Sequence, residues 1–465
     1  MEQLWVVGPL VAVGALAIAL LFAEFVFGPR GRLALLGVTV AGLTLSGIWA
    51  SRAFGLDKVV FSGAYRVDSL TAFVSVLLVA VNILVLLAAY RQGAAEGLGG
   101  DFYALMAFSI FGGMVMAGAN NLIMIYLGIE LVTLPCYVLV SLRRDDRRAA
   151  EAALKYFLLA ILTSVVMTYG MSLLYGLTGE IGFDAMAGAI TAEGLAGSPL
   201  FILAVALVSA GFSFKLAAAP FHFWAPDAYE GASTPVTAFI SAVPKFGALA
   251  GVIRVFQVAL SGAHAEWTTL FVIIAVLSML AGNLMAYQQR NIKRLLAYSS
   301  IAHAGYLFVA LAAGTELASA SVLFYITVYA AANLGAFFVV IAASGEELDD
   351  LGGLASRSPF LAASMLVFLL SLTGIPPLAG FMGKLFIFGA AIEGGLGWLA
   401  LVGVLNSVVS LGYYALIIKE MYMASPSGVS VGSSDTGAVA ATSACLVLVG
   451  VLGIFPNAVM ALLTG

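Results

Sequence analysis

Four ionisable residues, Glu130, Lys215, Lys245 and Lys384, lie deep inside stretches of sequence that are otherwise apolar. If those stretches cross a membrane, each such residue costs roughly 2.5–3.5 kcal/mol on insertion. A chain with so few charges does not place several of them in lipid without a role. The residue types indicate proton transfer, because lysine and glutamate can each hold or release a proton in a low-dielectric site.

The four residues predict a row of coupled proton sites. A buried lysine gives up its proton more readily than one in water, and a nearby carboxylate favours its charged form. We therefore interpret Glu130 and Lys215 as a switch pair, Lys245 as a central relay and Lys384 as the distal or exit site. Coupled titration along such a row can carry an electrostatic signal. The alternative is that the lysines only hold helices together.

Three further residues are candidates for accessory roles in this row. Lys155 lies about two turns inside its apolar stretch, where it could modulate the Glu130–Lys215 pair or reach the lipid headgroups. His222 stands beside a helix break close to Lys215, which suits a proton relay. His303 could also relay protons, or it could hydrogen-bond a neighbouring helix.

The composition excludes a water-soluble enzyme. Of the 465 residues, 62% are hydrophobic and only 9% are charged, whereas soluble domains carry about 25% charged residues. Two cysteines, Cys136 and Cys445, are too few for a disulfide framework or a cysteine-ligated metal cluster. The sequence has no glycine fingerprint, P-loop or paired haem histidines. We therefore expect no cofactor and no metal bound by this chain.

The apolar stretches predict an all-α polytopic membrane protein with about fourteen transmembrane helices. A spanning helix needs roughly 20 mainly apolar residues. The first stretch lacks a basic region and a cleavage site, so we expect a retained helix rather than a signal peptide. The expected spans are 5–27, 33–51, 68–90, 102–118, 121–141, 150–176, 199–220, 234–258, 267–287, 293–313, 317–343, 359–391, 396–423 and 437–463.

The basic residues predict that both termini face outside. Loops numbered alternately from an outside N-terminus place twelve basic residues inside and three outside, and positive loops stay in the cytoplasm. Arg254, near the outer end of its span, is interpreted as reaching the headgroups. The outside residues are Arg52, Lys58 and Arg66, and the inside residues are Arg30, Arg32, Arg91, Arg143, Arg144, Arg147, Arg148, Arg290, Lys293, Arg294, Arg357 and Lys419.

Prolines interrupt the seventh and twelfth spans, around Pro220 and Pro376–Pro377. Proline removes a helical hydrogen bond, and inside a membrane the freed carbonyls need a partner. The two breaks lie five spans apart, and an odd offset indicates inverted repeats. We expect helices 1–3 in residues 1–100, the first repeat (spans 4–8) in 101–260, the second (spans 9–13) in 261–425 and helix 14 in 426–465.

Four stretches carry a family resemblance: 214–239, Gly128-Ile-Glu-Leu, 297–306 and 374–384. The chain resembles the subunit N branch of the antiporter-like membrane subunits of proton-pumping NADH:quinone oxidoreductase, respiratory complex I. The resemblance covers nearly the whole chain. It implies fourteen helices with two inverted repeats. It also implies that Glu130, Lys215, Lys245 and Lys384 occupy the family's proton-channel positions, with Lys155 and His303 as accessory members.

The resemblance implies a subunit of a redox-driven proton pump in the bacterial cell membrane. NADH, FMN, iron–sulfur clusters and quinone would then lie on partner subunits. The partners would be other membrane-arm subunits, antiporter-like or small and hydrophobic, within the lipid bilayer, and no nucleic acid is expected. Lys384 and the loop Pro226-Asp-Ala-Tyr-Glu-Gly favour subunit N. Pro244 before Lys245 departs from the family pattern and predicts a kink.

Two alternatives remain at this point. One is a sodium/proton antiporter of the Mrp type, a secondary transporter of the same superfamily. The other is a similar membrane arm that takes electrons from a different donor, such as ferredoxin. The chain never touches the donor, so its sequence does not distinguish the second alternative from the favoured interpretation.

Overall fold

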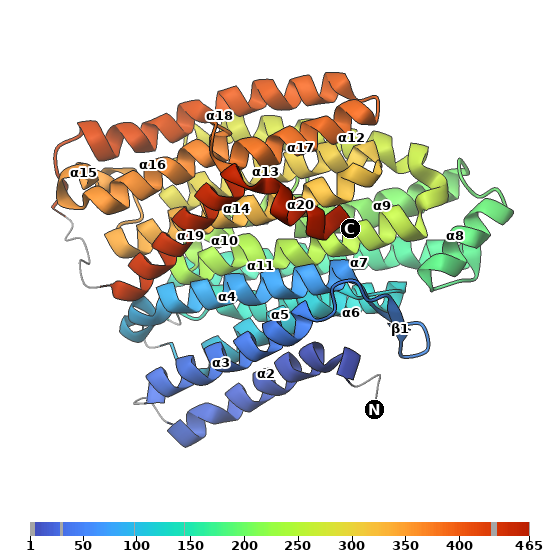
Figure 1. Ribbon diagram of the computed structural model, residues 1–465, viewed down its shortest axis with the longest axis horizontal. Helices are drawn as coiled ribbons and strands as arrows, with labels where there is room; N and C mark the ends of the chain where they lie inside the picture. The colour runs from blue at the N-terminus through green and yellow to red at the C-terminus, as the bar shows by residue number, and fades with distance from the viewer. Residues whose placement is uncertain (1–4, 28–30, 97, 144, 429–434, 465) are drawn as a thin grey trace.

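The computed structural model describes residues 5–27, 31–96, 98–143, 145–428 and 435–464, without the side chains of 24–27, 316 and 464. Its helices run side by side in one bundle (Figure 1). The first half contains α2 (Gly8–Phe27), α3 (Arg32–Ser51), α4 (Ser69–Ala95), α5 (Gly100–Ala117), α6 (Leu122–Val140), α7 (Arg147–Thr178), α8 (Phe183–Ala192), α9 (Pro199–Lys215), α10 (Trp224–Gly231) and α11 (Thr234–Val252), which continues as the π-helix η2 (Ile253–Ala259).

The second half also consists mainly of long helices. It contains the short η3 (Ser261–Ala263), α12 (His264–Ala286), α13 (Ile292–Ala313), α14 (Glu316–Ala343), η4 (Leu348–Leu351), α15 (Leu354–Arg357), α16 (Pro359–Thr373), α17 (Ala379–Glu393), α18 (Gly397–Met423), α19 (Thr436–Ile454) and α20 (Pro456–Thr464). The red C-terminal helices α19 and α20 lie across the middle of the bundle in Figure 1.

Three helices form the centre of the bundle. The apolar windows of α11 with η2, α13 and α14 are 100%, 100% and 94% buried, whereas those of α3, α7, α18 and α19 are only 28–33% buried. A helix that is apolar all round and buried belongs to the core, and one whose apolar side chains stay exposed needs lipid or a partner against it. The outer helices therefore present apolar surface around a protein-lined centre.

Both predicted helix breaks are present. Residues 216–223 separate α9 from α10, and residues 374–378 separate α16 from α17. Gly374 ends α16 with φ +95°, a left-handed conformation that glycine adopts without strain. The predicted span 14 is also interrupted, since α19 ends at Ile454 and Pro456 opens the short α20. By contrast, α11 continues through Pro244.

The prediction of an all-helical chain missed one hairpin. Strand β1 (Lys58–Val60) pairs antiparallel with β2 (Tyr65–Val67) in the loop between α3 and α4. The loop 177–198 likewise contains the short helix α8. Both segments contact the junction between α5 and α6, since Leu122 donates its amide to the carbonyl of Ile181 and Asn120 donates its amide to the carbonyl of Ala64. We call this end of the bundle the hairpin end.

The opposite end, which we call the basic end, carries loops in contact with one another. The backbone of Leu348 donates to Arg290, and Arg143 donates to the carbonyl of Ala232. Two basic residues that contributed to the orientation prediction, Arg30 and Arg144, lie outside the described residues.

The interpretation of Arg254 as a headgroup-reaching residue is wrong. Its side chain is 5% exposed, and its guanidinium donates to both carboxylate oxygens of Asp68 at 2.6 and 2.7 Å. It also donates to the carbonyl of Ala117 at 3.1 Å. Asp68 additionally caps α4 by accepting the amide of Thr71. Arg254 therefore ties η2 to α4 and α5 inside the protein, a pairing that sequence spacing of 186 residues does not reveal.

Candidate functional site

Lys215 is the last residue of α9, at the first helix break. Its ammonium group is buried and lies 3.4 Å from the hydroxyl of Thr133 on α6. The break is held from two sides, because the indole of Trp224 donates to the carbonyl of Phe214 and the amide of Ala219 donates to Ser278. A cation in the last turn of a helix faces the negative end of its dipole. The break thus fixes the lysine at the end of α9.

Glu130 lies on α6, three residues before Thr133. Its carboxylate is half-buried and accepts a hydrogen bond of 2.8 Å from Ser164 on α7. Within the described residues no ion pair joins Glu130 to Lys215. Residues 130 and 133 are one turn apart on a helix, but the Thr133 hydroxyl donates to the carbonyl of Ile129 at 2.7 Å rather than to Glu130. The two members of the predicted switch pair therefore have separate hydrogen-bond partners, Ser164 for Glu130 and Thr133 for Lys215.

Lys245 is fully enclosed in the central bundle. Its ammonium hydrogen-bonds the hydroxyl of Ser300 on α13 and lies 3.4 Å from the carbonyl of the same residue. The Tyr329 hydroxyl on α14 also donates to Ser300, at 2.7 Å. The aromatic ring of Tyr329 lies 5.5 Å from the ammonium. One serine therefore connects the central lysine to a tyrosine on another helix.

His303 lies one turn further along α13 than Ser300 and belongs to a tyrosine cluster. Its Nδ1 atom is 2.6 Å from the hydroxyl of Tyr325, and its Nε2 atom is 3.3 Å from that of Tyr414. Its ring also packs edge-on against Tyr306, with centroids 5.5 Å apart. Both ring nitrogens thus have phenol partners, an arrangement that can pass a proton from one side of the ring to the other.

Lys384 lies on α17 but reaches back across the second break. Its ammonium donates to the carbonyls of Leu372 and Thr373 at 2.9 and 2.8 Å. These carbonyls belong to the last turn of α16, which has no helical partners for them. The ammonium also lies 4.6 Å from the ring centroid of Tyr306, a cation–π distance. Lys384 therefore satisfies the helix end that the break leaves open.

Helix α13 connects Lys245 with Lys384. Ser300 contacts Lys245, His303 follows three residues later, and Tyr306, three residues further, contacts Lys384. Residues three apart lie on one face of a helix. The structure thus brings three of the predicted site residues into one polar line. Glu130 and Lys215 form a separate group on α6 and α9.

Lys155 and His222 lie elsewhere. The side chain of Lys155 is 48% exposed and pairs with Glu151 at 2.8 Å and with Asp227 at 3.1 Å, rather than with Glu130. His222 is buried in the segment between α9 and α10, and its ring stacks on Phe223 with centroids 4.5 Å apart. Neither makes a hydrogen bond to Lys215 within the described part of the chain.

Asp227 on α10 is the centre of an ion cluster at the basic end. Arg294 donates to Asp227 at 2.7 Å and to Glu230 at 2.9 Å, and Lys155 contacts Asp227 from α7. Burial alone would raise the pKa of Asp227, but the hydrogen bonds from Arg294 and Lys155 outweigh it and lower that pKa. The cluster ties α10, the second half of the broken helix, to α7 and α13.

The hydroxyl partners were missed from the sequence. Thr133, Ser164 and Ser300 each contact a predicted site residue. Serine and threonine are common in membrane helices as ordinary hydrogen-bond formers, so composition alone does not single them out. The usable signal is spacing, since Thr133 lies three residues from Glu130 and Ser300 three residues from His303.

A family model described as "NADH:quinone oxidoreductase/Mrp antiporter, TM" matches residues 119–410. The NADH-quinone oxidoreductase subunit N 1 of Rhizobium meliloti is 42% identical over 426 residues, which cover 90% of this chain and 88% of that protein. The chain belongs to the subunit N family of NADH-quinone oxidoreductases. It is a multi-pass membrane protein.

Two solved structures superpose on this chain over nearly its whole length. A chain of respiratory complex I from Thermus thermophilus superposes with a TM-score of 0.85 at 33% identity, covering 98% of this chain and all of that one. A chain of the Mrp complex from Dietzia sp. superposes with a TM-score of 0.83 at 21% identity, covering 99% and 95%. The second likeness shows the fold alone. This chain thus shares its fold with a chain of an Mrp complex.

Proposed function

We propose that this chain is a membrane-arm subunit of a redox-driven proton pump, an NADH:quinone oxidoreductase, and that it carries one proton pathway through its buried lysines. The observation that carries this proposal is the line on α13 from Lys245 through Ser300 and His303 to Lys384. A lysine in a protein-lined, low-dielectric site can exchange its proton when a neighbouring charge changes. The hydroxyls and imidazole between the two lysines supply the transfer steps.

The Glu130–Lys215 group would control that line. When Glu130 is the only neighbouring charge, its negative charge favours the protonated form of Lys215. A positive charge arriving beside Glu130 would screen the carboxylate, and Lys215 would then release its proton. The half-exposed position of Glu130 between α6 and α7 suits a signal that arrives from a neighbouring subunit. Lys155 and His222 would be accessory members that act on α10 and on the break.

The proposal includes the finer architecture. Eleven described helices are long and apolar enough to span a membrane, and the shorter Gly8–Ala23, Pro199–Lys215 and Pro359–Thr373 would complete fourteen spans. The interrupted helices α9–α10 and α16–α17 would occupy matching places in two inverted repeats, spans 4–8 and 9–13. We further propose that the basic end faces the cytoplasm and both termini the outside.

The redox chemistry would take place on partner subunits. Among the described residues there is no group of three His, Cys, Asp or Glu side chains that could hold a metal ion. Cys136 and Cys445 are buried in separate helices. What supports cofactors on partners is the similarity of this chain to subunit N and to a chain of respiratory complex I; the complex would use NADH, FMN, iron–sulfur clusters and quinone. This chain would bind none of them.

The test is proton uptake by the assembled complex in proteoliposomes, driven by NADH and quinone. Native complex should acidify the vesicle lumen, and a complex with Lys245→Met should assemble but pump several-fold less. Lys419→Met, which changes an exposed lysine at the end of α18, is the matched control. Normal pumping by Lys245→Met contradicts the proposal. A pH gradient generated by sodium alone, without NADH, would instead indicate an antiporter of the Mrp type.

A further inference from the structure

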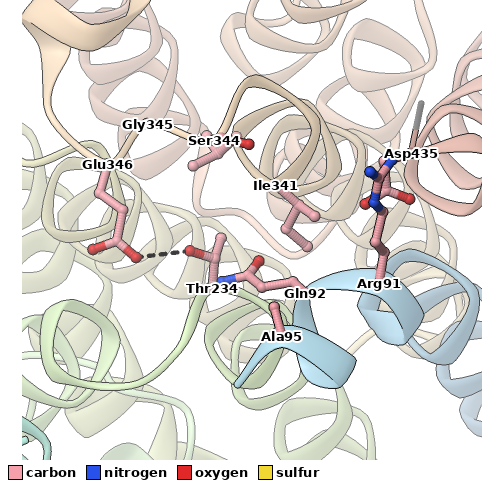
Figure 2. A pocket seen from close by; sticks show the side chains of 10 residues that line it. Arg91, Gln92, Ala95, Thr234, Ile341, Ser344, Gly345, Glu346 and Asp435 are labelled. Carbon is pink, nitrogen blue, oxygen red and sulfur yellow. Dashed lines mark hydrogen bonds between the residues drawn. The ribbon is translucent and has the colours of Figure 1, made fainter. Parts of the chain in front are cut away.

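A polar pocket of about 350 Å³ opens at the basic end of the bundle. Its walls come from the C-terminal ends of α4 and α14, from the first residue of α11 and from Asp435, which precedes α19. This volume is large enough for several water molecules, and its polar lining gives them hydrogen-bond partners. Figure 2 shows Glu346 and Thr234 together on one side of it, and Arg91 and Asp435 on the other.

Glu346 joins this pocket to the interior. One carboxylate oxygen accepts a hydrogen bond of 2.9 Å from Thr234 and lies 2.7 Å from the ammonium of Lys293. Glu346 is 38% exposed, whereas the side chain of Lys293 is 0% exposed and also donates to the carbonyl of Ala232 at 2.9 Å. Glu346 is thus a carboxylate with one side in water and the other on a buried cation.

From Glu346, polar side chains follow α11 and α14 toward Lys245. On α11, Ser241 lies seven residues after Thr234 and Lys245 lies four residues after Ser241. These spacings place all three on one face of the helix. On α14 Asn333 donates to Ser241 at 2.8 Å. Thr234 and Lys245 are eleven residues apart, or about 16 Å along a helix. The pocket and the central lysine therefore share one face of α11.

Neither Ser241 nor Asn333 lines the pocket. Phe337 lies one turn from Asn333 on α14, and its ring packs against that of Tyr229 on α10 with centroids 6.3 Å apart. The Oδ1 atom of Asn333 is buried and has no partner in the described part of the protein. Such an atom is usually satisfied by water. Loading at the pocket and transfer to Lys245 are therefore separate steps.

We propose that Glu346 is the proton-loading group at the inward mouth of the pathway to Lys245, with Lys293 as its fixed counter-charge. This inference rests on the proposed function. The Glu346 carboxylate takes a proton from pocket water, passes it to water between α11 and α14 when Phe337 moves, and returns to the anion. Lys293 holds the carboxylate charged between turnovers. The other charged groups around the pair are Arg91, Glu96, Arg143, Asp350 and Asp435.

The test is the pH profile of NADH-driven proton uptake by the assembled complex. Glu346→Gln keeps the acceptor for Thr234 but cannot load a proton. We expect uptake to fall about tenfold at pH 8 and less than about threefold at pH 6, where bulk protons reach the path without a collector. Glu346→Asp should keep the native profile. The matched control is Glu347→Gln. The carboxylate of Glu347 accepts a hydrogen bond from Asn291 at 2.9 Å and does not line the pocket.

A second variant keeps the test decisive if Glu346→Gln does not assemble. Ala95→Trp places an indole in the pocket and leaves the Lys293–Glu346 pair intact, so it should reduce uptake with a normal amount of complex. If Glu346→Gln or Ala95→Trp takes up protons like the native complex while Lys245→Met does not, this inference is wrong and the proposed function stands. Normal pumping by Lys245→Met overturns the proposed function as well.

Discussion

The Nζ atom of Lys384 lies 2.8 Å from the carbonyl oxygen of Thr373, the last residue of α16. A second carbonyl, that of Leu372, lies 2.9 Å away. Both carbonyls belong to the last turn of α16, which is the negative end of its dipole and favours a cation. The proline-rich break and the buried lysine are therefore one feature, because the break creates acceptors and the ammonium satisfies them. A change in the charge of Lys384 must alter the stability of the break.

Replacing Lys384 should separate its two roles. Lys384→Met leaves two buried carbonyls unsatisfied, which costs about 1–3 kcal/mol each, so both thermal stability and proton uptake should fall. Lys384→Arg keeps the hydrogen bonds but holds a cation that does not release its proton. We expect a near-native unfolding temperature and strongly reduced uptake from the arginine variant. Native uptake by Lys384→Arg would show that proton release from this residue is not required.

Ser300 should matter because it contacts both Lys245 and Tyr329. Ser300→Ala removes the hydroxyl and weakens the path by about 1 kcal/mol, which predicts a several-fold loss of proton uptake. Ser364→Ala is the control, since the Ser364 hydroxyl is equally buried on α16 and has no partner among the described residues. Equal uptake by the two variants would remove Ser300 from the pathway.

The ion cluster at Asp227 predicts a pH-dependent stability. Because Arg294 and Lys155 lower the pKa of Asp227, the cluster stabilises the folded state at pH values above the ordinary aspartate pKa of about 3.9. That contribution is lost as the pH falls through the lowered pKa. At pH 7 Asp227→Asn should cost about 1 kcal/mol in unfolding free energy. The difference in unfolding temperature between native and variant complexes should shrink below about pH 4, and a constant difference would contradict this account.

The Arg254–Asp68 pair should be structural. Arg254→Leu removes both short hydrogen bonds to Asp68 and leaves this partly buried carboxylate only Arg66, at 3.8 Å, so we expect a cost at or below the lower end of the about 3–5 kcal/mol for breaking a buried pair. Adding Asp68→Asn should recover part of the loss, because the amide is neutral and can still cap α4. Thermal unfolding of the single and double variants measures both effects. A double variant no more stable than Arg254→Leu would argue against an unpaired charge as the cause.

The sequence predicted the features that rare residues mark. Prolines within apolar runs identified both helix breaks, and lysines in a chain with 9% charged residues identified the enclosed ammonium groups. It did not predict the partners. The depth of Lys155 in its apolar stretch predicted a role beside Glu130 and Lys215, but its long side chain pairs with Asp227 on another helix. Arg254 pairs with Asp68, which is 186 residues away in the sequence. Such long-range pairs depend on how helices pack, which local spacing does not encode.

The most direct test of the central claim is the rate of proton uptake, measured together with the rate of quinone reduction. Both rates are measured with NADH in proteoliposomes for native complex and for Lys215→Met and Lys384→Met, each shown to be assembled, with Lys419→Met as the control. We predict that the control keeps both native rates. Each of the two buried-lysine variants should lose proton uptake, together with the quinone reduction that is coupled to it. Native rates in both variants would contradict a proton pathway through these lysines.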